Sequence, residues 1–471
     1  MTDHTDTGEH GTPPPITREI DLSPAQRKTV KKSVLGAMAG NAIEWFDYGI
    51  YGYLTVYLSS QIFGDTENAL LWTLFGFAVS FLVRPLGGAV LGPLGDRIGR
   101  QKVLVVTITL ISISTACIGL LPTFDMIGWW APVLLFTLRI IQGFSAGGEY
   151  AGAAVFMAEH APDNRRGFWG SFLEFGTLLG FSAAAILVTV MQLTLGDEFM
   201  QEWGWRIPFL LTLPLGAFAL YMRSSLHESA TFEEAHAHDK NSSAWQTLGD
   251  LFRNQPKQLL KIMGIVILIN VAFYVVLTYM PTYLTVSLEM DATTSGLMLV
   301  GVQLAMMAVI VPLGALTDRI GRRPVLITAS IGFVVLSIPA IMLLDTGNLA
   351  LQILGTSIFG LLLVMLLSNI SASLPALFPT PVRLAGFALG YNIATSIFGG
   401  TAGLANQALI EATGSTLIPG FYLTAAGIIG LVAVLTFNET AGRSLRGDVV
   451  PGDDDQKRLE LGEELIGKVR A

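Results

Sequence analysis

The chain has 471 residues, of which 52% are hydrophobic and 14% charged, and its mean hydropathy is +0.57. This composition excludes a soluble globular domain and predicts a membrane protein. The net charge of −8 comes largely from acids in tails and loops and indicates no nucleic-acid partner, while the single cysteine, Cys117, excludes a disulfide within the chain.

Apolar runs recur along the sequence, each long enough to cross a hydrocarbon core of about 30 Å as a helix of about 20 residues. Lipid offers the backbone no hydrogen-bond partners, and the runs are too long for barrel strands. We therefore predict an all-α membrane protein with twelve transmembrane helices in two six-helix halves. The predicted spans are 33–57, 70–92, 102–121, 131–157, 167–192, 205–222, 258–283, 293–315, 324–343, 348–375, 384–410 and 417–438.

Polar segments flank and separate the two halves. The predicted organisation is an N-terminal tail (1–32), a first half (33–222), a connector (223–257), a second half (258–438) and a C-terminal tail (439–471). The N-terminal tail lacks the apolar core and cleavage site of a signal peptide and is expected to be disordered. His236 and His238 in the connector lack further ligands, so no metal site is predicted.

Lysine and arginine residues gather on one side of this twelve-helix scheme, whereas the loops on the other side hold only Arg206. The positive-inside rule therefore places both termini in the cytoplasm. The expected location is the cytoplasmic membrane of the cell, crossed several times.

An internal repeat relates the halves. GPLGDRIGRQK, from Gly92 to Lys102, joins the second and third spans, and GALTDRIGRRP, from Gly314 to Pro324, joins the eighth and ninth. A shared DRIGR in the same loop of each half indicates two halves related by an axis along the membrane normal, which is typical of transporters.

The first of these loops carries a family resemblance. Gly92, Asp96, Arg97, Gly99 and Arg100 resemble the signature loop of the major facilitator superfamily. Five stretches, GNAIEWFDYGIYGY, FLVRPLGGAVLGPLGDRIGRQK, GFSAGGEYAGAAVFMAEHAPDNRRGF, WGWRIPF and VLTYMPTYL, resemble the metabolite:proton symporters of that superfamily, most closely the branch that carries proline and glycine betaine. The resemblance covers roughly residues 33–446.

The resemblance implies a proton-coupled importer of small zwitterionic compatible solutes that works by alternating access and needs no cofactor. Its implied partners are the solute, protons and the lipid bilayer. Sister branches of the family carry 2-oxoglutarate, citrate or shikimate, so a symporter of a small organic acid is the chief alternative. A transporter-like receptor that binds a solute without net flux is a further alternative.

Charged side chains are costly at membrane depth and commonly mark functional sites. The predicted spans of the first half carry Glu44, Asp47, Arg84, Arg139, Glu149 and Glu174. At membrane depth the second half carries no charged residue, and its buried polar candidates are neutral amides such as Asn270. Proton coupling is therefore predicted for the first half.

Helical spacing places Glu44, Asp47, Tyr48 and Tyr51 on one face of the first span, which should line the transport cavity. We expect Asp47 to alternate between pairing with Arg139 and carrying the coupled proton, because a solute carboxylate would draw the arginine away. A purely structural ion pair is the alternative. The remaining three carboxylates are the other candidate proton carriers.

A zwitterion needs a cation for its carboxylate and aromatic faces for its ammonium group. Arg139 and Arg84, which precedes Pro85, are the candidate cations, although Arg84 could instead pair with Glu174 or Glu149 and hold helices together. The other candidate binding residues are Trp45, Tyr48, Tyr51, Asn270, Phe273, Tyr274 and Tyr391. Packing or an interfacial position is the ordinary alternative for aromatic residues in membrane helices.

The two DRIGR loops are predicted to gate access rather than to bind solute. Asp96 is expected to pair with Arg383 across the halves, and Asp318 with the segment Arg165–Arg166. The residues assigned to gating are Gly92, Asp96, Arg97, Gly99, Arg100, Arg165, Arg166, Asp318, Arg319, Arg322 and Arg383. Simple anchoring under the positive-inside rule is the alternative.

The stretch GFSAG, from Gly143 to Gly147, matches the Gly-x-Ser-x-Gly motif of hydrolases. That motif requires a strand and a sharp turn, whereas this stretch lies in an apolar span, so Ser145 is not expected to be a nucleophile and no enzyme is predicted. The glycines are instead expected to permit close helix packing.

Overall fold

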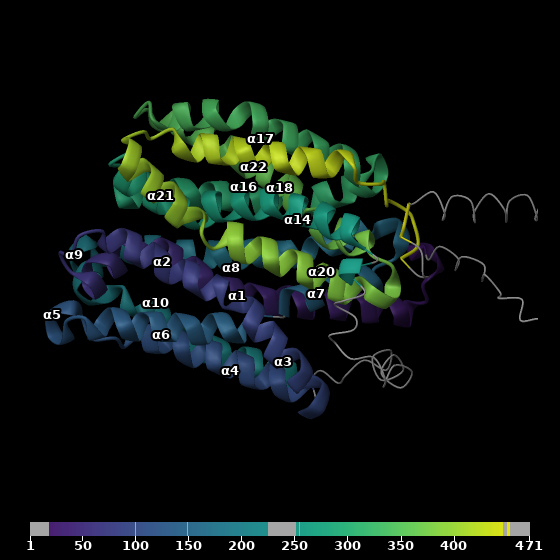
Figure 1. The fold of residues 1–471 in the computed structure, drawn as a ribbon, viewed down its shortest axis with the longest axis horizontal. Coiled ribbons are helices and arrows are strands. Elements are labelled where there is room, and N and C mark those ends of the chain that lie inside the picture. Colours follow the sequence, from purple (N-terminus) through teal and green to yellow (C-terminus); the bar gives the residue numbers. More distant parts are fainter. Residues whose placement is uncertain are drawn as a thin grey trace, which may run out of the picture.

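The computed structural model describes residues 18–98, 100–147, 149–224, 251–253, 255–445 and 450–452. Every regular element in these ranges is a helix, and the helices form two groups that lie side by side (Figure 1). Seven of the described helices are long and apolar enough to cross a membrane, and helices also occupy the other predicted spans. The prediction of an all-α membrane protein is therefore confirmed.

The first half comprises α1 (Pro24–Phe63), α2 (Ala69–Leu82), α3 (Arg84–Ile98), α4 (Arg100–Gly119), α5 (Phe124–Ile127), α6 (Trp130–Ser145), α7 (Glu149–His160), α8 (Arg166–Leu195), α9 (Asp197–Phe199), η3 (Met200–Gly204), α10 (Arg206–Leu210) and α11 (Thr212–Ser224). The second half comprises α14 (Pro256–Phe273), η4 (Tyr274–Tyr279), α15 (Met280–Thr282), η5 (Tyr283–Ser287), α16 (Ala292–Ile320), α17 (Arg322–Leu344), α18 (Leu349–Leu367), α19 (Ile370–Ser373), α20 (Arg383–Ala394), η8 (Thr395–Gly399), α21 (Ala402–Thr413) and α22 (Ile418–Leu435).

Helix α1 begins earlier than the apolar pattern predicts. Ser23 and Gln26 form a capping box, with the Ser23 side chain accepting from Gln26 N and the Gln26 side chain accepting from Ser23 N, and Pro24 occupies the first helical position. These local signals extend the helix into residues predicted to belong to a disordered tail, so that prediction is wrong from Pro24 onward.

Two spans of the first half are interrupted. The second span breaks at Val83, between α2 and α3, next to Pro85, which has no backbone N–H to donate within the helix. The fourth span ends its first segment, α6, at Ser145. Glycines let these spans pack closely, since a Cβ added at Gly143 would overlap the backbone carbonyl of Ser80 and one at Gly147 would overlap that of Arg84. The expected role of the GFSAG glycines in packing is confirmed.

Replacing Gly143 with alanine is expected to destabilise the protein by about 1–3 kcal/mol, because the new methyl group meets the backbone of α2 and the helices must separate. Gly301→Ala is the matched control. It lies within α16, where an added Cβ meets nothing within 4 Å, so it should stabilise by up to about 1 kcal/mol through helix propensity. Thermal unfolding of both variants in detergent checks the prediction, and equal stability of the two would contradict it.

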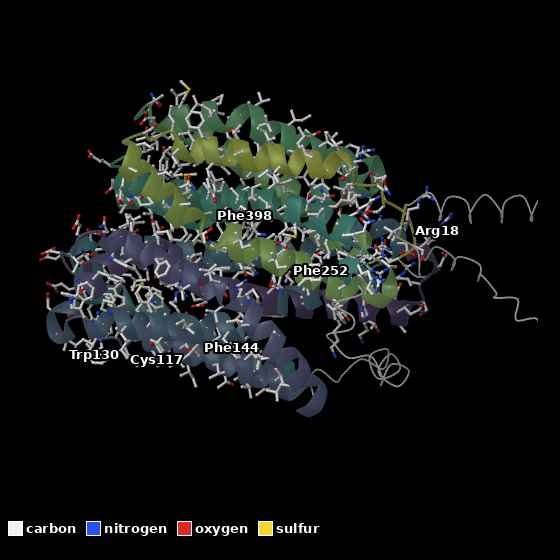
Figure 2. All side chains as sticks on the ribbon, viewed as in Figure 1. Arg18, Cys117, Trp130, Phe144, Phe252 and Phe398 are labelled. Carbon is white, nitrogen blue, oxygen red and sulfur yellow. The ribbon has the colours of Figure 1, made fainter. Side chains whose placement is uncertain are left out.

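The bundle has two chemically distinct ends. We call the end at which α1 begins and α22 finishes the terminal end, and the other the opposite end (Figure 1). Figure 2 shows nitrogen-bearing side chains gathered at the terminal end, near Arg18. The buried core runs between the ends and joins both halves in one continuous hydrophobic cluster.

Candidate functional site

Helix α1 supplies the central side chains of the candidate site. Asp47, Tyr48 and Tyr51 are buried on the face that their spacing predicts, whereas Glu44 is half-buried. This face lies against the second half as well as the first, since Trp45 next to it contacts rings from both.

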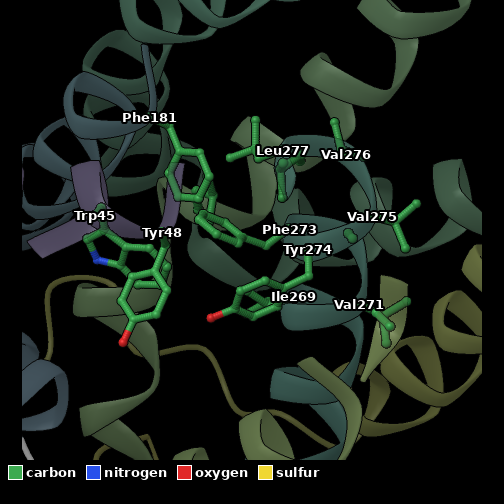
Figure 3. Packing of buried hydrophobic residues seen from close by; sticks show 14 of the residues in the cluster. Trp45, Tyr48, Phe181, Ile269, Val271, Phe273, Tyr274, Val275, Val276 and Leu277 are labelled. Carbon is green, nitrogen blue, oxygen red and sulfur yellow. The ribbon is translucent and has the colours of Figure 1, made fainter. Parts of the chain in front are cut away.

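Aromatic rings from both halves fill the middle of the bundle. We call Trp45, Tyr48, Phe77, Phe81, Phe181, Phe273 and Tyr274 the aromatic cluster. Ring centroids lie 4.9 Å apart for Trp45 and Phe273, and 5.0 Å apart for Phe81 and Tyr274. Figure 3 shows Trp45 and Tyr48 facing Phe273 and Tyr274 across the boundary between the halves. Any relative movement of the halves must therefore separate these rings.

Arg84 lies buried beside this cluster at the start of α3. Its Nη2 donates to the hydroxyl of Tyr48, and its guanidinium lies 4.1 Å from the centre of the Phe81 ring. It makes no ion pair with a described residue, and its Nε has no hydrogen-bond partner there. The alternative pairing with Glu174 is absent because Glu174 accepts from Tyr150 instead, and the Glu149 side chain lies outside the described residues.

Asp47 and Arg139 do not form the predicted direct ion pair. Gln142 lies between them: Arg139 Nη1 donates to Gln142 Oε1 at 2.8 Å, and Gln142 Nε2 lies 3.3 Å from Asp47 Oδ2. The amide also donates to Thr115 at 2.6 Å. In this arrangement Gln142, one helical turn from Arg139, takes the position between them, and Arg139 stacks 3.6 Å from the centre of the Tyr51 ring. Alternation between a paired and an unpaired Asp47 therefore stays a prediction.

This relay leaves buried polar atoms without partners. Asp47 Oδ1 and both Nε and Nη2 of Arg139 make no hydrogen bond with a described residue. An unpaired charged group away from water is costly. A proton or a water molecule would stabilise Asp47 Oδ1, and a water molecule or an acceptor group of the solute would stabilise the two Arg139 nitrogens. An acidic and a basic side chain, each with atoms that lack hydrogen-bond partners, therefore lie close together in the first half.

Glu174 belongs to a polar contact within the first half that reaches the boundary between the halves. The hydroxyl of Tyr150 on α7 donates to Glu174 on α8, and the Tyr150 ring stacks on Tyr391 of α20 with centroids 4.6 Å apart. Trp45 meets the edge of Tyr150 at 6.3 Å, which connects this contact to the aromatic cluster.

In this arrangement the side chains of two other predicted binding residues, Tyr51 and Asn270, already contact protein groups. Arg139 covers a face of Tyr51, and the Tyr51 hydroxyl donates to the backbone of Thr73 at 2.7 Å. The amide of Asn270 donates within its own helix to Val266 at 3.0 Å. Tyr274, by contrast, is buried with its hydroxyl unpartnered among the described residues.

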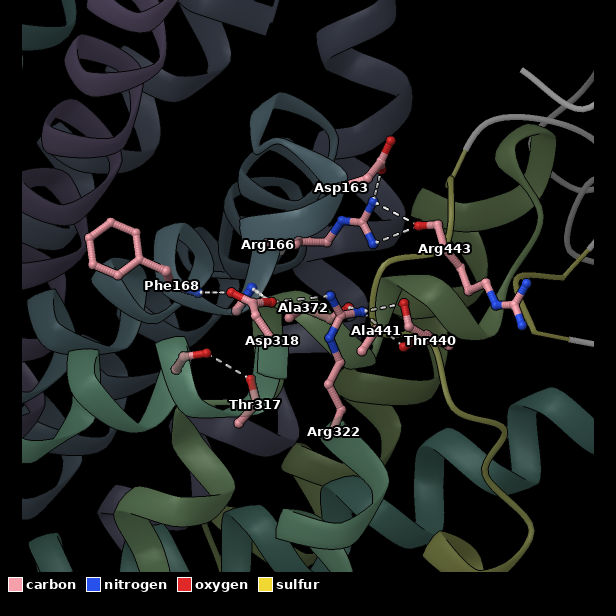
Figure 4. Close-up of polar contacts among 12 residues, drawn as sticks. Asp163, Arg166, Phe168, Thr317, Asp318, Arg322, Ala372, Thr440, Ala441 and Arg443 are labelled. Atoms are coloured by element: carbon pink, nitrogen blue, oxygen red, sulfur yellow. Dashed lines mark hydrogen bonds and ion pairs between the residues drawn. The ribbon is translucent and has the colours of Figure 1, made fainter. Parts of the chain in front are cut away.

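The terminal end joins the two halves by hydrogen bonds (Figure 4). Asp318 at the end of α16 accepts from the backbone amides of Gly167 and Phe168 at 2.7 and 2.8 Å, which caps α8 of the other half. The predicted partner of Asp318 was the segment Arg165–Arg166. The observed partners are the two residues that follow this segment. Arg165 instead pairs with Glu19 at 2.7 Å.

Two acids that the sequence did not single out complete this network. Glu439 accepts from the amides of Arg322 and Arg323 at 3.0 Å each and so caps α17. Arg383 pairs across the halves with Glu159 at 2.9 Å. Both acids follow the predicted spans or lie at their ends, where acidic residues usually face water. The sequence criterion, a charged residue inside an apolar span, therefore did not select them.

Several arginines at this end bond to backbone carbonyls. Arg166 donates to the carbonyls of Ala158 and Arg443, and Arg322 donates to Ala372 and Thr440. Arg319 is exposed and takes no part in the network.

Some predicted residues cannot be placed. Gly99, His236 and His238 lie outside the described residues, as do the side chains of Asp96, Arg97 and Arg100 and the surroundings of Gly92.

Two membrane-spanning halves that share a buried, charged and aromatic site define a solute transporter rather than an enzyme. The family model of the Major Facilitator Superfamily matches residues 37–404 and 283–452. The chain belongs to this superfamily, as the loop after the second span predicted.

Curated relatives match nearly the whole chain. It is 42% identical over 442 residues to the putative proline/betaine transporter of Staphylococcus haemolyticus, covering 93% of each protein. It is 38% identical over 457 residues to the proline/betaine transporter of Escherichia coli (strain K12), covering 95% of this chain and 91% of that one. The ectoine/proline transporter ProP of Corynebacterium glutamicum is 39% identical over 455 residues, covering 94% and 90%.

The fold is also that of solved transporters. The proton:xylose symporter XylE, bound to 6-bromo-6-deoxy-D-glucose, superposes with a TM-score of 0.69 over 93% of this chain and 99% of that chain, at 18% sequence identity. At this identity the likeness shows the fold alone, and it confirms the predicted major facilitator architecture.

Proposed function

We propose that this protein is a proton-coupled importer of small zwitterionic compatible solutes, such as proline and glycine betaine, in the cytoplasmic membrane. The relatives that span nearly its whole length are named for these solutes. The observation that carries the proposal is Arg84, a buried guanidinium with an unpartnered Nε beside an aromatic cluster shared by both halves.

The two ends of a zwitterion match these two features. Its carboxylate would accept hydrogen bonds from Arg84, and its ammonium group would lie against the faces of Trp45, Phe273 and Tyr274. The rings now contact one another directly, so the solute enters only when the halves separate at this level. Because the site is built from both halves, their relative movement first closes it around the solute and then opens it to the opposite side of the membrane.

The contacts at the terminal end support a gating role for the charged loops. Asp318 and Glu159 each bond across the halves there, and the chain after α22 reaches Arg166 through the carbonyl of Arg443. If both termini are cytoplasmic, these contacts close the cytoplasmic side. Opening that side requires the capping bonds of Asp318 to break, and Asp96 in the equivalent loop is proposed to act in the same way.

We assign proton coupling to Asp47, with Arg139 and Gln142 as its partners. A solute carboxylate bound near Arg84 adds negative charge close to Asp47, which favours the uptake of a proton by that carboxylate. Glu174, held by Tyr150 at the boundary between the halves, is the second candidate carrier. Glu44 and Glu149 remain further candidates.

Uptake by sealed proteoliposomes tests the proposal. Vesicles containing the purified protein, acidified outside, are expected to accumulate labelled proline or betaine, and a protonophore should abolish the accumulation. Unlabelled 2-oxoglutarate, citrate or shikimate should compete poorly. Accumulation of one of these acids without accumulation of the zwitterions would establish the organic-acid alternative, and tight binding without flux would establish a receptor.

A further inference from the structure

A separate cavity lies between the halves toward the opposite end. Its volume is about 150 Å³, and α1, α8, α9 and η3 of the first half and α15, η5 and α16 of the second form its walls. It reaches along α1 to Tyr57, about 13 Å beyond Tyr48 at 1.5 Å per residue. Neither Arg84 nor any member of the aromatic cluster lines it, so this cavity is distinct from the candidate solute site.

The charge of this cavity is negative. Among the described residues that line it, Asp197 is the one with a charge, and the hydroxyl of Tyr57 donates to Asp197 Oδ1 at 2.5 Å. Asp197 is exposed where it borders the cavity, and its Oδ2 bonds to no described residue. None of the described residues that line the wall is a lysine or an arginine. The first turn of α16 also borders the cavity, but Asp291 caps it by accepting from Thr294 N, which offsets the positive end of that helix.

The wall carries unpartnered acceptors as well as charge. The hydroxyls of Thr282 and Ser295 are each on residues only 1% exposed, and neither makes a hydrogen bond with a described residue. The side-chain oxygen of Gln201 is likewise buried and unpartnered. Buried polar atoms usually have partners, so three orphaned oxygens around one cavity indicate that something occupies it.

We propose that this cavity is an outer binding site for small ammonium compounds, with Asp197 as the counter-charge and Tyr53 and Tyr57 as aromatic walls. An apolar cavity of about 150 Å³ holds benzene, and tetramethylammonium, which is of comparable size, fits this one. In transport, the site would receive the nitrogen end of a zwitterion before it reaches Arg84. That last role rests on the proposed function, whereas cation binding itself does not.

Tetramethylammonium separates this site from the central one, because it has no carboxylate to engage Arg84. Calorimetry on the purified protein is expected to detect its binding, and Asp197→Asn should weaken the affinity at least tenfold. Glu198→Gln is the matched control, since it removes the same charge from the neighbouring exposed residue and should change the affinity less than twofold. Absent binding, or equal binding by Asp197→Asn and the unmodified protein, would overturn the proposal.

A labelling experiment locates the ligand. In a Cys117→Ser background, Ser295→Cys introduces one thiol into the cavity wall, and tetramethylammonium should slow its reaction with a cationic methanethiosulfonate reagent at least fivefold. The same protection should persist when Arg84→Ala is added. Loss of protection in that variant would assign the cation to the central site and reject the outer one. Protection together with absent solute uptake by the unmodified protein would reject the proposed function while supporting the outer site.

Discussion

Arg84→Ala is expected to lower the uptake of proline or betaine at subsaturating concentration by about 30-fold to about 3,000-fold. Removing one member of a buried, hydrogen-bonded charge pair costs about 2–5 kcal/mol, and each 1.4 kcal/mol corresponds to about tenfold. Arg84 is buried at the boundary between the halves, and its free Nε makes it the described cation best placed to receive a carboxylate. Arg84→Lys should recover only part of the loss, because an ammonium cannot donate two parallel hydrogen bonds.

Arg206→Ala is the matched control for this prediction. Arg206 also lies over an aromatic ring, 4.2 Å from Trp205, and also has an unpartnered nitrogen, Nη1. It bonds to the backbone of Leu121, which also belongs to the first half. Its replacement should change uptake less than threefold. The measurement is the initial rate of solute uptake in proteoliposomes that contain equal amounts of each variant. Comparable losses of uptake in both variants would show that Arg84 does not bind the solute.

The helical architecture could be predicted from the sequence because a membrane imposes it. The bilayer requires apolar runs of one length, and these predicted the spans without knowledge of packing. The start of α1 could not be predicted from hydropathy, since it depends on the hydrogen bonds of Ser23 and Gln26 rather than on apolar length. Proline chemistry contributes to the interruption next to Pro85 but does not suffice for it, since Pro312 and Pro339 lie within the continuous helices α16 and α17.

The candidate site could be predicted only in part. The charges at membrane depth singled out Asp47, Arg84 and Arg139, because each is costly to bury. Their partners depend on which helices touch, and spacing along one helix carries no such information. Hence the position of Gln142 between Asp47 and Arg139 was not predicted, nor was the position of Phe81 under Arg84.

Asp47→Asn is expected to abolish accumulation of solute driven by an external acid pulse while preserving exchange of solute across the membrane. The asparagine has the same shape and can still accept from Gln142, so solute binding at Arg84 should persist. It cannot take up a proton, so the step that couples the gradient to the solute is lost. Accumulation should fall at least tenfold, and counterflow of labelled proline against unlabelled proline should change less than threefold.

Glu174→Gln serves as the comparison, since it neutralises the other buried acid in contact with the boundary between the halves. The Tyr150 hydroxyl can still donate to the amide oxygen, so its ring should keep its place on Tyr391. If Asp47 carries the proton, Glu174→Gln retains accumulation and Asp47→Asn does not. The reverse result would assign the proton to Glu174. In that case the Asp47–Gln142–Arg139 relay would be a structural link between α1 and α6, stabilising the helix contact that holds Tyr51 under Arg139.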